Sequence, residues 1–132
     1  MNMRLLGTAL ITAGLLAPWQ SALAANKPLS TLLETVAEKY PGTLTEAELD
    51  KNTWEIKSCD AQSCVKTYVN PASGEIRSTK NIDYVELPNK DAEPLLSIVK
   101  RIEAAHIGDI TEIEFKRGQW KIELRLEQAP RP

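Results

Sequence analysis

The sequence predicts an α+β fold made of a tandem repeat, in which each unit is a helix followed by an antiparallel β-hairpin or sheet. A constant offset of 66 residues superposes two stretches of the chain without a gap, starting from Pro28 and Pro94. In each stretch the apolar residues recur first at helical spacing and then in alternation. An internal repeat of this kind indicates one supersecondary unit used twice. The identical pairs are Pro28/Pro94, Leu29/Leu95, Gly42/Gly108, Thr45/Thr111, Glu46/Glu112, Glu48/Glu114, Trp54/Trp120 and Ile56/Ile122.

The helix of each unit is predicted from apolar residues that share one helical face. Pro28 suits a first turn, and Pro41 with Gly42 ends the first helix. The second helix has Asp91 as its expected N-cap and ends near Gly108. The predicted apolar faces are Leu29, Leu32, Leu33, Val36 and Ala37 in the first unit, and Leu95, Ile98, Val99, Ile102 and Ala105 in the second.

The hairpin of each unit is predicted from a period of two after each glycine. The first hairpin turns at 50–53 and the second at 116–119. Only the first unit continues, with a strand over 65–69 and another over 75–77, and residues 78–90 are expected to cross between the units. Trp54 and Trp120 hold the same inward position and are expected to anchor the core. In the second hairpin the inward residues are Thr111, Ile113, Phe115, Trp120, Ile122, Leu124 and Leu126.

The first residues have the pattern of a secretory signal peptide, with Arg4, an apolar run over 5–17 and cleavage after Ala24. The apolar run is shorter than the about 20 residues that a membrane span needs. We therefore expect a periplasmic or secreted protein without a membrane span in the mature chain. The expected organisation is a signal peptide over 1–24, a first unit over 25–80, a linker over 81–93, a shortened second unit over 94–127 and a flexible tail over 128–132.

The charge balance argues against two classes of partner. Removing the signal peptide takes away Arg4, so the 16 Lys and Arg fall to 15 against 18 Asp and Glu, a formal charge of −3. A net negative chain is a poor ligand for nucleic acid or for an anionic membrane surface.

The only cysteines, Cys59 and Cys64, are expected to form a disulfide in an exported chain. If they face each other across a hairpin, the register gathers the apolar residues on the face that meets the helix. A structural staple is the leading interpretation. A redox-active pair is the alternative, although the spacing is C-x4-C. The predicted pairs are Ser58 with Val65, Lys57 with Lys66, Ile56 with Thr67, Glu55 with Tyr68 and Trp54 with Val69.

The residue types do not assemble a catalytic site. His106 is the only histidine and falls at the end of the second helix, where it is expected to be partly exposed. The sequence has no glycine-rich phosphate loop and no nucleophile beside a base. We therefore expect no enzyme activity, no cofactor and no metal site. Glutamate pairs on the predicted strands leave one alternative open, since they would bind a cation if they converged with further ligands. These are Glu46, Glu48, Glu112 and Glu114.

The first unit resembles the PepSY domain. The resemblance rests on a helix that ends in Tyr40-Pro41-Gly42, the segment Thr43 to Leu49, the strand that starts at Trp54 and the closing turn Val69 to Ile76. It covers about Leu29 to Ile76, with a shortened copy over Leu95 to Leu126 that lacks the last hairpin. The layout is analogous to that of β-lactamase-inhibitor-like proteins. The resemblance implies a binding role in the bacterial envelope, with restraint of a peptidase as the function, and no enzyme activity.

We therefore expect a binding protein that contacts a protein partner, with a peptidase as the implied class, through the outward face of its sheet. The candidate contact residues are Glu55, Lys57, Lys66 and Tyr68 beside the disulfide hairpin. An exposed tyrosine on a stiffened hairpin is a contact of low entropic cost, and two lysines facing each other call for an acidic partner group. The alternative is an envelope component that binds a small ligand or a metal ion between the two units.

Overall fold

A computed structural model describes residues 26–126 of the chain, and the predicted signal peptide and tail lie outside this range. The elements are α2 (Leu29–Lys39), β2 (Thr43–Asp50), β3 (Thr53–Cys59), β4 (Cys64–Val69), β5 (Ile76–Ile82), α3 (Leu95–Ala105), β6 (Asp109–Lys116) and β7 (Gln119–Arg125). The α+β class is confirmed.

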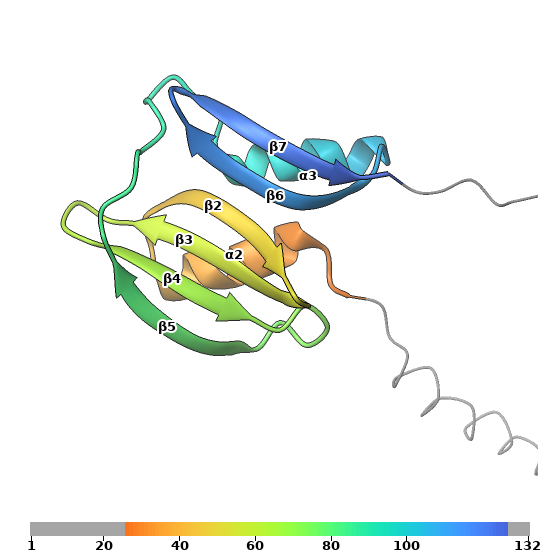
Figure 1. Cartoon of the computed structure of the whole chain (residues 1–132), viewed down its shortest axis with the longest axis horizontal. Coiled ribbons are helices and arrows are strands. Elements are labelled where there is room, and N and C mark those ends of the chain that lie inside the picture. The colour runs from red at the N-terminus through yellow and green to blue at the C-terminus, as the bar shows by residue number, and fades with distance from the viewer. Residues whose placement is uncertain (1–25, 127–132) are drawn as a thin grey trace, which may run out of the picture.

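The six strands form one antiparallel sheet in the order β5-β4-β3-β2-β6-β7, and both helices lie on the same face of it (Figure 1). The two hairpins join edge to edge through β2 and β6. The other face carries no helix. We call it the outer face.

The second half of the fold starts 66 residues after the first, element by element. The bounds of α3, β6 and β7 are those of α2, β2 and β3 moved by this offset. At the junction, Ala47 lies directly opposite Ile113, the residue 66 positions further along the chain. The two hairpins therefore meet through equivalent strands in opposite directions, as in a two-fold arrangement.

The core lies between the helices and the sheet. Each helix buries the apolar stripe that its sequence predicts, including Leu32, Val36 and Val99. Trp54 is buried in the same cluster, and Trp120 packs partly buried against it. The Trp120 indole N–H donates to the Glu93 carbonyl at 2.9 Å, which satisfies the polar end of the ring.

Both hairpins carry a β-bulge at the same place. The register shifts between Leu44 and Glu46 in β2 and between Ile110 and Glu112 in β6. The Thr45 hydroxyl donates to the Lys57 carbonyl at 3.4 Å, and the Thr111 hydroxyl donates to the Glu123 carbonyl at 3.3 Å. Beyond each bulge the glutamates return to the outer face, because the extra residue resets the alternation.

Three details differ from the sequence prediction. Strand β5 continues to Ile82, because as an edge strand it satisfies its backbone by pairing with β4 and needs no apolar period. Helix α3 has Pro94 as its N-cap, and Asp91 was the wrong prediction. The inward residues Ile122 and Leu126 are 37% and 68% exposed, because β7 lies at the edge of the sheet.

Candidate functional site

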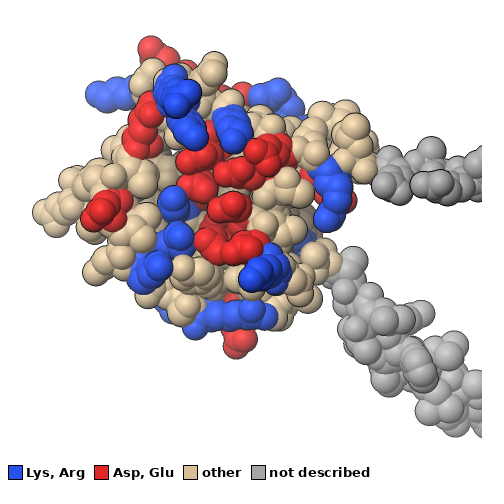
Figure 2. Space-filling view, in the orientation of Figure 1, with Lys and Arg blue, Asp and Glu red and all other residues tan. Residues whose placement is uncertain are grey.

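Charged side chains cover the outer face in two rows that cross all six strands. Each row follows from the strand register, since directly opposite residues point to the same side of a sheet. From β5 to β7, one row reads Lys80, Lys66, Lys57, Glu46, Glu114 and Lys121, and the next reads Ser78, Tyr68, Glu55, Glu48, Glu112 and Glu123. The two rows divide the face into an acidic centre and a basic flank. Figure 2 shows acidic side chains gathered over the middle of the sheet with basic side chains around them.

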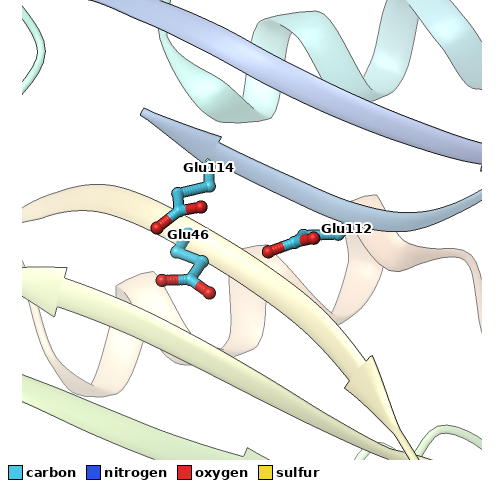
Figure 3. A group of neighbouring side chains, drawn as sticks. All are labelled: Glu46, Glu112 and Glu114. Atoms are coloured by element: carbon cyan, nitrogen blue, oxygen red, sulfur yellow. The ribbon is translucent and has the colours of Figure 1, made fainter. Parts of the chain in front are cut away.

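We call the six glutamates of these rows the glutamate patch, namely Glu46, Glu48, Glu55, Glu112, Glu114 and Glu123. At its centre, Glu46 faces Glu114 and Glu48 faces Glu112 across β2 and β6. The carboxylates of Glu46, Glu112 and Glu114 converge, each offering an oxygen within 4.8 Å of the others (Figure 3). The structure therefore brings together all four glutamates that the sequence singles out, at the junction of the two hairpins.

The crowding of carboxylates changes how two of them titrate. Burial raises the pKa of Glu48, and the neighbouring carboxylates of Glu46 and Glu55 raise it further. Burial also raises the pKa of Glu112, with Glu123 and Glu48 acting in the same direction. Both carboxyl groups therefore hold their proton more strongly than an isolated glutamate does.

Cations compensate part of this negative charge. Glu46 is only 7% exposed, and its carboxylate lies 2.8 Å from the Lys57 ammonium. At the β7 edge, Lys121 lies 3.2 Å from Glu123, and its hydrogen bond to Glu123 raises the lysine pKa. The patch therefore combines carboxylates with a few lysines that already hold partners.

The basic flank, which we call the lysine patch, consists of Lys57, Lys66 and Lys80 on three successive strands. The ammonium groups of Lys66 and Lys80 each lie 5.9 Å from the centre of the Tyr68 ring. Lys66 also lies 3.3 Å from Glu55. Burial alone would lower the pKa of Lys66, but its hydrogen bond to Glu55 outweighs burial and raises it.

The predicted contact residues thus lie together at the boundary of the two patches. Glu55 faces Tyr68, and Lys57 faces Lys66, as the cysteine register predicts. Sequence reasoning missed Lys80, because residues 78–90 show no period that would place it on the sheet. It also missed Lys121 and Glu123, although their alternation in β7 was visible and placed them on the polar side.

Cys59 and Cys64 form a disulfide, and all five predicted pairs behind it are present. The bond lies on the outer side of the hairpin but is buried. Ile82 lies directly opposite Cys64, and the Tyr84 hydroxyl donates to the Asp60 carbonyl at 2.6 Å, so the end of β5 and the chain after it lie against this turn. Disulfides persist in oxidising compartments, which supports an extracellular or envelope location.

His106 lies away from both patches, at the C-cap of α3 on the helix side. It is exposed and stands at the rim of a cavity of about 690 Å³. Glu103 lines the same cavity, but its carboxylate accepts hydrogen bonds from the amide and hydroxyl of Ser30. Within residues 26–126, no helix has the length and apolar character needed to cross a membrane.

The comparisons with known proteins leave the family open. No protein-family model and no curated protein sequence matches the chain. Among solved structures, the chain is similar to one described as a "putative lipoprotein" from Clostridium difficile 630. The two are 11% identical, the match covers 78% of this chain and 80% of that one, and the TM-score is 0.47. So distant a likeness carries no argument about function, and the PepSY resemblance stays a prediction.

Proposed function

We propose that this chain is an exported, non-enzymatic binding protein that takes a protein partner on its outer face. The observation that supports the proposal most is the alignment of six glutamates and three lysines as two adjacent patches on a face without a helix. The partner would place basic groups over the glutamate patch and acidic groups over the lysine patch. Such complementary potentials favour one orientation of the partner and exclude wrong partners.

Like charges directly opposite each other on a sheet destabilise it. This protein carries two such contacts at the junction, Glu46 with Glu114 and Glu48 with Glu112, and a third between Lys57 and Lys66. A partner of opposite charge would relieve all three. The cost in the free protein is therefore a physical reason to expect a ligand for this face.

Tyr68 supplies the apolar part of the proposed contact. Its ring lies between two ammonium groups on a hairpin that the disulfide closes. A tyrosine fixed in this way loses little entropy on binding, and tyrosine is common among the residues that contribute most to binding energy. We therefore place the centre of the contact at Tyr68, Lys66 and Glu55, with the glutamate patch as its acidic side.

The finer part of the proposal concerns family and partner class. We propose that the two helix-and-hairpin units are copies of one PepSY-like unit, the second without the last two strands, and that the partner is a peptidase whose activity the binding restrains. The equal spacing of the element bounds supports the first statement. The second rests on the resemblance in sequence.

The test uses the exported, oxidised protein as immobilised bait for an envelope extract. Three baits are compared: wild type, an outer-face variant with Lys66→Ala and Tyr68→Ala, and a helix-side control with Glu34→Gln. Glu34 forms an exposed ion pair with Lys100 in the helix layer, so the control changes charge on the opposite face. We expect a partner that wild type and control retain and the outer-face variant loses.

The recovered partner is then assayed for cleavage of a fluorogenic peptide. Addition of wild-type protein should slow the cleavage, and the outer-face variant should not. A partner without peptidase activity would contradict the partner class. Equal recovery with all three baits would contradict the binding face itself.

A second candidate function is binding of a divalent cation by Glu46, Glu112 and Glu114. Their convergent oxygens favour it, because calcium takes six to eight oxygen ligands and three carboxylates offer up to six. Calcium or zinc should then raise the melting temperature of wild type and not that of Glu114→Gln. The exposed Glu38→Gln on α2 is the matched control. Equal shifts in all three proteins would contradict a specific site.

A further inference from the structure

The edge strand β7 has a neighbour on one side only among the described residues. Strand β3, which lies 66 residues earlier, is paired along the corresponding edge with β4. Figure 1 shows β7 as the last strand of the sheet, with nothing drawn along its free side. The second half of the fold therefore leaves open an edge that the first half covers.

The turn before β7 shows which backbone groups point to this open edge. Arg117 and Gly118 both have positive φ, 53° and 80°, as in a two-residue type I′ hairpin turn. In such a turn the flanking residues, Lys116 and Gln119, form a hydrogen-bonded pair. Since bonding direction alternates along an antiparallel strand, every second residue of β7 points its N–H and C=O away from β6. These residues are Trp120, Ile122 and Leu124.

The side chains around the open edge are unusually apolar for solvent. Ile122, Leu126 and Ile107 are 37%, 54% and more exposed, with Ile107 at 54% and Leu126 at 68%. The opposite edge of the sheet, β5, instead carries Arg77 and Lys80. Proteins commonly protect an exposed edge with such cations, because a bare apolar edge pairs with other chains. The contrast marks β7 as the edge that pairs.

We propose that β7 pairs antiparallel with β7 of a second copy about a two-fold axis at Ile122, so that two six-stranded sheets become one. The occupant of the edge is inferred from charge complementarity within the strand itself. The outer side chains of β7 are Gln119, Lys121, Glu123 and Arg125, which alternate in sign around Ile122. A two-fold axis perpendicular to the sheet keeps the outer faces of both copies on the same side.

Only one of the three central registers is compatible with these charges. With Ile122 opposite Ile122 of the second copy, Lys121 faces Glu123 twice, Trp120 faces Leu124 and Gln119 faces Arg125. A shift in one direction places Lys121 opposite Lys121, and a shift in the other places Glu123 opposite Glu123. Like charges directly opposite are destabilising, so both shifted registers are disfavoured. In the favoured register, the hydrogen-bonding groups of Trp120, Ile122 and Leu124 also meet those of the second copy.

The first test measures self-association by sedimentation velocity over a concentration series. Wild type should show a reversible monomer–dimer equilibrium. Lys121→Glu and Glu123→Lys should each weaken dimerisation by roughly tenfold, since each turns two attractive pairs into repulsive ones. The double variant Lys121→Glu/Glu123→Lys should restore it, because the exchanged residues face each other. Lys100→Glu, which reverses an exposed charge on α3, should leave it unchanged.

A protein that stays monomeric at all concentrations would overturn the proposal, as would equal association of wild type and both single variants. Circular dichroism melts show that each variant is folded before it is compared. The double variant guards against a trivial result, since it carries both substitutions and should still dimerise.

The second test fixes the register by cross-linking. Ile122→Cys should form a disulfide-linked dimer under air oxidation faster than Lys121→Cys or Glu123→Cys, because directly opposite residues of a hydrogen-bonded pair lie about 5.5 Å apart at Cα, within disulfide reach. Faster cross-linking of Lys121→Cys or Glu123→Cys would overturn the register, and no cross-linking of any variant would overturn the pairing. Neither test involves Tyr68 or Lys66, so self-pairing and partner binding fail or succeed separately.

Discussion

Glu48 and Glu112 lie directly opposite each other across β2 and β6, with the pKa of both carboxyl groups raised by burial and by other glutamates. The charged pair therefore opposes folding at neutral pH. We expect Glu48→Gln to stabilise the protein by roughly 0.5 kcal/mol, or about 3 °C in melting temperature. Thermal melts at pH 7 measure this, with Glu34→Gln as the control. A lower melting temperature for Glu48→Gln would show that the contact is favourable in the folded protein.

The same two groups predict a pH dependence. Their folded pKa values lie above the ordinary value of 4.5, so between these limits the folded state binds more protons than the unfolded state. Their contribution to the free energy of unfolding must then fall as pH rises through the raised pKa values. We expect Glu48→Gln/Glu112→Gln to melt close to wild type below pH 4.5 and increasingly above it at higher pH. A difference that does not change with pH would contradict the assignment.

The disulfide predicts a modest loss of stability when it is removed. It closes a loop with a sequence separation of 5, for which the chain-entropy relation gives about 2 kcal/mol. Cys59→Ala/Cys64→Ala should therefore stay folded and melt roughly 10 °C lower than wild type. Because both cysteines are buried, mild reductant should leave the bond intact in the native protein. Rapid reduction without unfolding would instead favour the redox interpretation of this pair.

Glu103 predicts a coupling between the two helices. Its carboxylate, on α3, accepts from the Ser30 amide at 3.0 Å and from the Ser30 hydroxyl at 2.6 Å. It thus satisfies an amide in the first turn of α2, which has no side-chain cap at Pro28. Glu103→Ala should lower the free energy of unfolding by about 1 kcal/mol, measured from the midpoint of urea denaturation. Glu103→Gln keeps one acceptor and should lose less; equal losses would place the effect elsewhere.

Much of the first unit could be predicted from local patterns. The cysteine spacing gave the hairpin register, because two residues that must meet and one apolar face leave only one alignment of β3 and β4. The helices followed from apolar spacing between proline and glycine. Strand β5 was too short in the prediction because edge pairing, which no local pattern records, carries it through Thr79 to Ile82.

The joining of the hairpins was beyond the sequence, because nothing local states which strand edges pair. The β2·β6 register brings Glu46 against Glu114 and Glu48 against Glu112. The glutamates were visible as pairs along each strand, yet their convergence depends on this one long-range contact. The exposure of Ile122 has the same origin, since alternation identifies the inward side of a strand but not how far the helices cover it.

The separation of the lysine patch from the glutamate patch gives the outer face an electric dipole in the plane of the sheet. A dipolar face turns an approaching charged molecule before the two surfaces touch. Added salt should therefore slow the association of a bound partner far more than it changes the rate of dissociation, since counter-ions screen charges separated by more than about 10 Å at 0.1 M salt. The row of residues from Lys80 to Glu114 thus acts over a longer range than any of its individual contacts.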